Sequence, residues 1–191
     1  MAEKTSHNKL NRINSIVLTV VLVISVGICG CTTTPSEKQE EKTLLTITVG
    51  SYENVYSLDD LTSLDTVTGQ GSYINKAGTI TGPDTYTGVT VRELLDTIPF
   101  LPSNYTIHAL ASDNYSINYT IDELNGHVSI FNETGDEIGT GNLTMILAYT
   151  ENGVFLNETT KGPLRIAFVG TEPSLTDSAM WLSHLVKIEI I

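Results

Sequence analysis

The sequence has very little cysteine, and all of it lies near the N-terminus. Among 191 residues the only cysteines are Cys29 and Cys31. Two cysteines a single residue apart cannot link distant parts of a fold, and no CxxC pair exists for zinc or dithiol chemistry. The chain beyond residue 31 therefore excludes disulfide stapling, a cysteine nucleophile and a thiolate-bound metal.

Basic residues are also scarce. Ten Lys and Arg face 22 Asp and Glu, which gives a formal net charge of −12. A polyanion of this kind is repelled by phosphate backbones, so nucleic acid is excluded as a partner. The catalytic and phosphate-binding patterns GxSxG, HExxH and GxxxxGK are absent as well, and no GxGxxG follows a strand.

The N-terminal segment has the order of a secretory signal. Lys4, Lys9 and Arg12 precede an almost uncharged run over 16–28, and small residues follow it. This run of 13 residues is shorter than the roughly 20 that span a bilayer as a helix. The segment predicts a signal peptide over residues 1–30 and export of the chain.

The stretch Ile28-Cys29-Gly30-Cys31 resembles a lipobox, in which the cysteine at the cleavage point becomes lipid-modified. Cys31 is therefore the predicted lipidation site, although Cys29 occupies a position that usually holds Ala, Ser or Thr. Two alternatives are an uncleaved signal helix that anchors the chain and cleavage without lipidation. The favoured interpretation is an exported protein anchored to the outer face of the cell membrane.

Residues 31–42 contain no apolar side chain after Cys31 and are predicted to be a flexible tether. The folded domain is predicted over 43–191, about 150 residues, which is enough to bury a core without staples. Three basic residues and only one acid precede residue 31, so the exported part has seven basic residues against 21 acids and a charge of −14.

The Asn-x-Ser/Thr pattern occurs more often than chance predicts in a chain this rich in Ser and Thr. If these sites are used, they lie at a glycosylated cell surface; alternatively, a Thr-rich β-protein produces the pattern without use. The candidate asparagines are Asn104, Asn114, Asn118, Asn132, Asn142 and Asn157.

Alternating and β-branched segments predict a sheet-rich domain with short helices, of the α+β class with a mixed or antiparallel sheet. The predicted strands are 43–50, 64–73, 105–111, 115–119, 128–131, 143–149, 164–169 and 186–191. Capping signals predict helices from Ser57, from Thr90 and from Thr120, and a fourth helix is predicted over 177–185. Gly and Pro predict a loop over 79–88.

Few residues of the domain suggest chemistry by themselves. His108 and His127 lie in separate strand-like segments, which favours packing or surface positions over a metal pair. The loop 132–142 has many oxygen donors but lacks the ligand spacing of a calcium loop, which favours a solvated hairpin. Trp181 is predicted to be a core residue in preference to a stacking platform.

Five motifs in order resemble the molybdopterin-binding domain of sulfite-oxidase-type oxidoreductases. They are YTGVTVRELL at 86–95, ASDNYS at 111–116, LAYTENG at 147–153, GPLRIAFVG at 162–170, and Trp181 with KIE at 187–189. The resemblance implies that family's fold over about 43–191, and it implies a molybdopterin cofactor with molybdenum.

The departures from the family bear on function. In the family a cysteine binds the molybdenum just before the first motif, in a stretch corresponding to 68–73, where this chain has none. Met180 replaces a basic residue of the family, and Val169 replaces its proline. Arg165 matches the "P-L-R" position and is the best candidate for a ligand contact, with Arg92 as the second. For Arg165 the alternative is a stem packed along a strand with its head paired to an acid.

The sequence is compatible with two functions. The favoured one is a lipid-anchored binding or interaction module at the cell surface, with an envelope protein or a small ligand as partner. The other is a molybdopterin-dependent oxidoreductase acting at the cell envelope. The missing cysteine and the acidic charge favour the first, because a thiolate ligand is absent and a polyanionic cofactor would be repelled.

Overall fold

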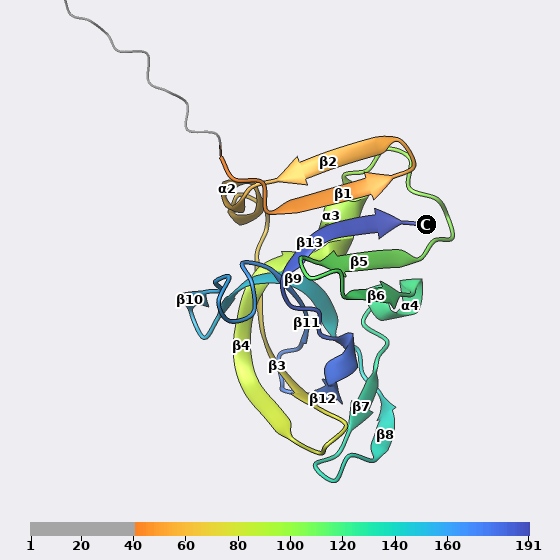
Figure 1. Cartoon of the computed structure of the whole chain (residues 1–191). Helices are drawn as coiled ribbons and strands as arrows, with labels where there is room; N and C mark the ends of the chain where they lie inside the picture. The colour runs from red at the N-terminus through yellow and green to blue at the C-terminus, as the bar shows by residue number, and fades with distance from the viewer. Residues whose placement is uncertain (1–40) are drawn as a thin grey trace, which may run out of the picture. The chain divides into compact units, whose positions relative to one another are not determined.

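A computed structural model describes residues 41–191 (Figure 1). The predicted signal peptide, the lipobox with Cys31 and nearly all of the tether lie outside the described residues. Within residues 41–191, no helix is both long and apolar enough to cross a membrane.

The first of two sheets has five strands in the order β2-β1-β13-β5-β6. β1 and β13 run parallel, and the other neighbouring pairs are antiparallel. The strands are β1 (Leu45–Val49), β2 (Tyr52–Tyr56), β5 (Ile107–Ala111), β6 (Ser116–Tyr119) and β13 (Leu185–Ile190).

The second sheet has eight strands, in the order β10-β9-β4-β3-β12-β7-β8, with β11 paired to β9 outside this path. Gln70 and Gly170 form an antiparallel bridge, so that β3, β4, β9 and β11 form a closed ring of paired strands. The strands are β3 (Val67–Ile74), β4 (Ile80–Thr90), β7 (Ser129–Phe131), β8 (Glu137–Thr140), β9 (Thr144–Glu151), β10 (Val154–Phe155), β11 (Arg165–Val169) and β12 (Leu175–Asp177).

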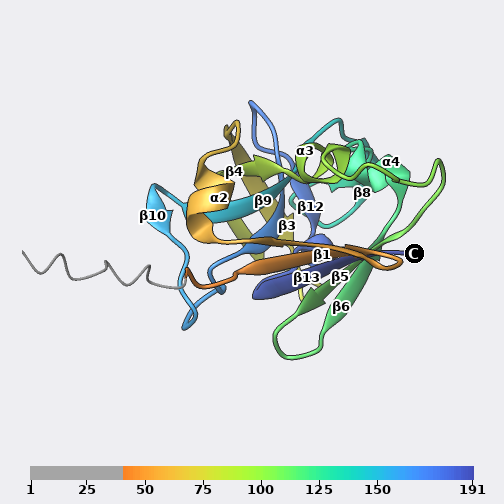
Figure 2. The same ribbon diagram turned by 90° about the horizontal axis from the view of Figure 1, so that it is seen from above.

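The helices are short and begin where capping residues stand. They are α2 (Leu58–Thr62), α3 (Val91–Asp96), α4 (Ile121–Leu124) and the 3₁₀ turn η1 (Ser178–Met180). Ser57 and Thr120 form reciprocal capping boxes, and the Thr90 side chain accepts a hydrogen bond from the Glu93 backbone N–H. Helices α2, α3 and α4 lie along one face of the five-stranded sheet (Figure 2).

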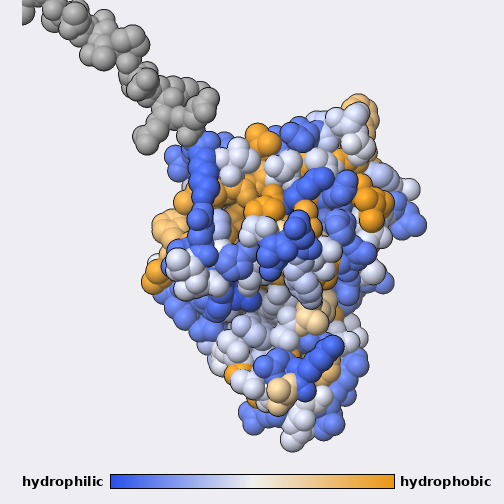
Figure 3. Space-filling model, viewed as in Figure 1, coloured by the Kyte–Doolittle hydropathy of each residue, from blue (hydrophilic) through white to orange (hydrophobic). Residues whose placement is uncertain are grey.

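The core contains both sheets and the inner sides of the helices. β11 is buried at every position and β9 at all but its ends, which confirms the prediction that the apolar run at 143–149 is a strand covered on both faces. Hydrophilic residues are spread over the face shown in Figure 3, with hydrophobic residues in small groups between them. The prediction of a sheet-rich domain with mixed pairing and short helices agrees with this arrangement.

The predicted loop at 79–88 is wrong, because this segment is most of strand β4. Its register with β3 shifts between Gly71, which pairs with Asp84, and Tyr73, which pairs with Thr81. Gly82 and Pro83 fall in this irregular stretch, where the missing N–H of proline costs no ladder hydrogen bond.

The predicted helix at 177–185 is also wrong. Only the single turn η1 forms, capped by the Asp177 side chain, which accepts a hydrogen bond from the Ala179 N–H. Beyond it Trp181 is extended, and its indole N–H donates to Thr176 Oγ1 at 2.8 Å. The Leu182 carbonyl accepts a hydrogen bond from the Ile166 N–H on β11, so tertiary contacts prevail over helix propensity here.

Candidate functional site

Arg165 is the first residue of β11 and is almost completely buried. Its segment is apolar and β-branched, and it pairs with Ala148 on β9. The side chain is only 2% exposed, and its Nε and Nη1 atoms have no hydrogen-bond partner among the described residues. None of the three ion pairs within residues 41–191 involves it. A buried guanidinium without a partner is costly, so this side chain requires an explanation.

Three aromatic rings surround the guanidinium carbon of Arg165. The distances from Cζ to the ring centroids are 4.9 Å for Trp181, 5.4 Å for Tyr86 and 5.6 Å for Tyr73. Trp181 also contacts both tyrosine rings, with centroid separations of 4.9 and 5.3 Å. Cation–π attraction to desolvated rings contributes about 2 kcal/mol, which offsets only part of the cost of burying the charge.

The neighbouring acid, Glu151, already has two partners. The Tyr86 hydroxyl donates to its Oε1 atom at 2.9 Å, and Lys161 forms an ion pair with the same atom. Burial raises the pKa of Tyr86 well above its usual value, so the phenol stays protonated at neutral pH. Because Tyr86 is neutral and Glu151 is engaged elsewhere, the positive charge of Arg165 remains uncompensated.

A chain of hydrogen bonds connects this cluster to strands β3 and β12. Trp181 donates to Thr176 Oγ1, and the Thr176 hydroxyl donates to the Ser72 carbonyl at 3.0 Å. The Ser72 hydroxyl donates to the carbonyl of Ser174, also at 3.0 Å. These bonds fix the tryptophan ring beside Arg165 and fix Ser72 at the edge of a pocket.

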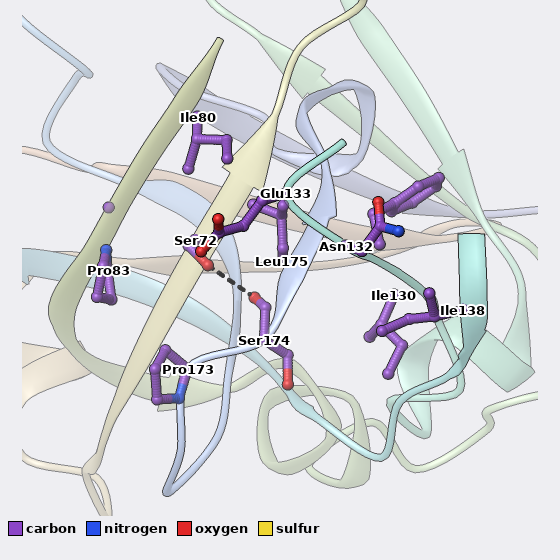
Figure 4. A pocket seen from close by; sticks show the side chains of 12 residues that line it. Ser72, Ile80, Pro83, Ile130, Asn132, Glu133, Ile138, Pro173, Ser174 and Leu175 are labelled. Carbon is purple, nitrogen blue, oxygen red and sulfur yellow. Dashed lines mark hydrogen bonds between the residues drawn. The ribbon is translucent and has the colours of Figure 1, made fainter. Parts of the chain in front are cut away.

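That pocket has a volume of about 520 Å³ and lies between β3, β4, the β7–β8 hairpin and the start of β12. Figure 4 shows Ile80 and Pro83 on one side of it and Ile130 and Ile138 on the other. Its lining residues are Ser72, Ile80, Gly82, Pro83, Ile130, Phe131, Asn132, Glu133, Ile138, Pro173, Ser174 and Leu175.

The two arginines singled out in the sequence are not brought together. Arg92 lies on α3 and its Nη2 atom donates to Asn125 at the end of α4, whereas Arg165 lies among the rings. The prediction of Arg165 as a candidate contact remains open, but the alternative of a guanidinium paired to an acid does not describe it. Trp181 is buried, as predicted for a core residue, and it also contacts the cation.

The histidines and the sequons have separate surroundings. His108 Nδ1 lies 2.7 Å from Asn118 Oδ1, and residues 41–191 contain no group of three or more side chains suited to hold a metal. The loop at 132–142 forms the β7–β8 hairpin, as predicted. Asn132 is half-buried in the pocket lining, whereas the other sequon asparagines are exposed.

The sequence predicts neither the place of Tyr73 beside Arg165 nor the pocket, although Tyr73 lies in the stretch 68–73 and three lining residues lie in the loop 132–142. Tyr86 is the first residue of the motif at 86–95, but its position beside Arg165 depends on the pairing of β4 with β9. Predicting this site would require knowing which distant strands pair with one another, and a single sequence does not show that pairing.

Comparison with known proteins gives the fold class. No protein-family model and no curated protein matches the chain. Among solved structures, the sulfane dehydrogenase SoxCD from Paracoccus pantotrophus is similar, with a TM-score of 0.55 and 17% sequence identity. The match covers 76% of this chain and 37% of the SoxCD chain. At this identity the likeness shows a shared fold alone.

The residues present do not fit the molybdopterin that the resemblance in sequence implies. The stretch 68–73, where the family has its cysteine, lies in β3 and contains no thiol, and at one of its positions, Gly71, a Cβ atom would lie 2.7 Å from the Phe168 carbonyl oxygen and 2.7 Å from Trp181 Cη2. The pocket beside it has no Arg, Lys or His in its lining, and its only charged side chain is Glu133. A phosphate-bearing cofactor requires cationic or N–H donors, and molybdenum requires the thiolate.

Proposed function

We propose that this protein is an exported, lipid-anchored binding module with a molybdopterin-oxidoreductase-like fold, and that Arg165 contacts a small anion. The fold likeness supports the domain class, and the missing cysteine argues against metal chemistry at the family's position. The observation that carries the proposal is the buried guanidinium with two unpartnered nitrogens. An oxyanion supplies acceptors for those nitrogens and neutralises the charge.

Sulfate, sulfite or phosphate is expected to stabilise the protein. A ligand that binds only the folded state adds about 2.7 kcal/mol when present at 100 times its Kd. Trp181 is the only tryptophan, and its ring centroid lies 4.9 Å from Arg165 Cζ, so its emission reports binding at this site. We expect a saturable fluorescence change and a raised Tm with at least one of these anions, relative to sodium chloride at equal ionic strength after long equilibration.

Arg165→Met and Arg92→Met form a matched pair for this test. Each removes one arginine charge, but only Arg165 lies among the rings. The anion response should disappear in Arg165→Met and persist in Arg92→Met. A wild-type protein without a saturable response to any of the three anions would refute anion binding at Arg165.

The second candidate function is a molybdopterin-dependent oxidoreductase at the cell envelope, which the likeness to a sulfane dehydrogenase favours. The lining without Arg, Lys or His and the absence of cysteine from the stretch 68–73 argue against it. Molybdenum and pterin measured in protein purified from its native host distinguish the two. Stoichiometric metal and pterin would overturn the binding-module proposal, and we expect neither.

Membrane anchoring is tested at Cys31. Cys31→Ser should move the protein from the membrane fraction to the soluble extracellular fraction, because the acyl chains attach at this residue. Cys29→Ser, one residue from the cleavage point, is the control and should leave partitioning unchanged. If the wild-type protein keeps residues 1–30 and carries no acyl chain at Cys31 by mass spectrometry, the signal helix is the anchor and the lipidation proposal is wrong.

A further inference from the structure

The pocket between β3, β4, β12 and the β7–β8 hairpin has no role in the anion proposal. We propose that it binds an organic cation with a compact apolar body. This inference concerns a separate site and does not depend on the anion at Arg165. It rests on the size, lining and charge of the pocket.

The volume of about 520 Å³ lies within the range of pockets that hold small ligands. Apolar side chains from separate segments form its walls, as Figure 4 shows for Ile80 and Pro83 opposite Ile130 and Ile138. Ile138 is 61% exposed and Ile80 is 40% exposed, although both line the same concave surface. A ligand with an apolar body would remove this surface from water, which is worth about 25 cal/mol per Å².

The charge of the pocket lining favours a positively charged ligand. Glu133 is the only charged residue in the lining, and its carboxylate has no hydrogen bond or ion pair among the described residues. Asp84, Glu137 and Glu172 adjoin lining residues in the sequence but are not part of the lining, and Asp84 and Glu137 already accept hydrogen bonds from Asn152 and Ser129. With no basic side chain in the lining, the pocket attracts cations and repels anions.

Hydrogen bonds within the turn 132–136 hold the backbone around Glu133 in place. Asn132 Oδ1 accepts from the Thr134 N–H at 3.0 Å, from the Thr134 hydroxyl at 2.7 Å and from the Asp136 N–H at 2.9 Å. This turn includes Glu133 and fixes its backbone relative to β7. A site organised before binding loses less entropy when the ligand enters.

The test uses three probes with the same apolar body: adamantylmethylammonium, adamantylmethanol and adamantanecarboxylate. Their affinities for the wild-type chain are measured by titration of protein NMR signals at low and high salt. We expect the ammonium to bind most tightly, at least threefold more tightly than the alcohol, and the carboxylate least. The advantage of the ammonium should shrink at high salt, because exposed charges are screened.

Two variants locate the binding, each with a matched control. Glu133→Gln should weaken the ammonium about threefold, as expected for an exposed ion pair, and leave the alcohol unchanged. Ile138→Ser should weaken both about fivefold through lost apolar contact. Glu53→Gln on β2 makes the same change, and Val154→Ser on β10 a similar apolar-to-polar change, at exposed positions outside the pocket, and both should have no effect.

Equal binding of all three probes would overturn the proposal. Equal losses of affinity in the control variants would overturn it as well, because the acidic protein would then attract cations without a specific site. The oxyanion response of Trp181 is measured separately on the same variants. It should be intact in Glu133→Gln and Ile138→Ser, so failure at one site is distinguishable from failure at the other.

Discussion

Alanine in place of Gly71 is expected to lower the free energy of unfolding by about 3 kcal/mol, and cysteine by at least as much. The added Cβ would lie 2.7 Å from the carbonyl oxygen of Phe168, a backbone atom of β11 that cannot rotate away. It would also meet Trp181 Cη2 at 2.7 Å, so relief requires both β3 and the ring beside Arg165 to move. Urea unfolding followed by circular dichroism measures the loss.

Gln70→Ala is the control, because Gln70 is the exposed neighbour on the same strand. It should change stability by less than about 0.5 kcal/mol. A Gly71→Cys protein as stable as the wild type would show that β3 accepts a thiol at this position. The remaining structural evidence against the family's cofactor site would then be the pocket lining, which has no Arg, Lys or His.

The parts of the fold that were predictable are those with strong local signals. The buried strand β9 appears as a continuous apolar run, and Ser57, Thr90 and Thr120 mark helix starts because their side chains satisfy free backbone N–H groups. The hairpin between β5 and β6 follows from two alternating segments and a turn. For these elements the local chain and the tertiary structure favour the same conformation.

The secondary-structure predictions are wrong where tertiary contacts determine the conformation of the segment. Strand β4 contains Gly82 and Pro83, which break a local strand pattern, but its partners β3 and β9 supply hydrogen bonds along the rest of its length. Strands β2, β10 and β12 are not predicted from the sequence either. β12 has only three residues, and its conformation depends on pairing with β3 and β7, which are distant in the sequence.

The candidate site could be predicted only in part. Arg165 stood out because it matches a family position and is one of two arginines beyond the signal segment. Its aromatic surroundings combine Tyr73, Tyr86 and Trp181 from three segments, so they require the completed fold. The pocket has the same origin, since its walls come from four parts of the chain that carry no shared motif.

The burial of Arg165 changes what its removal is expected to do. If Arg165 were only a ligand contact at the surface, Arg165→Ala would abolish ligand binding with little loss of stability. Arg165 is only 2% exposed and is surrounded by three aromatic rings, so truncating its side chain leaves a large cavity. We expect Arg165→Ala to lose about 3 kcal/mol of stability even without any ligand, as measured by urea unfolding in anion-free buffer.

Arg165→Met separates the volume of this side chain from its charge. Methionine fills most of the same space, and replacing an unpaired buried charge by an apolar group of similar size is often neutral or stabilising. In anion-free buffer Arg165→Met should therefore lie within about 1 kcal/mol of the wild type, while Arg165→Ala lies well below both. If Met proves as destabilising as Ala, attraction between the guanidinium and the rings of Tyr73, Tyr86 and Trp181 stabilises the domain by itself. The buried charge would then have a structural cause, and an anion would no longer be needed to explain it.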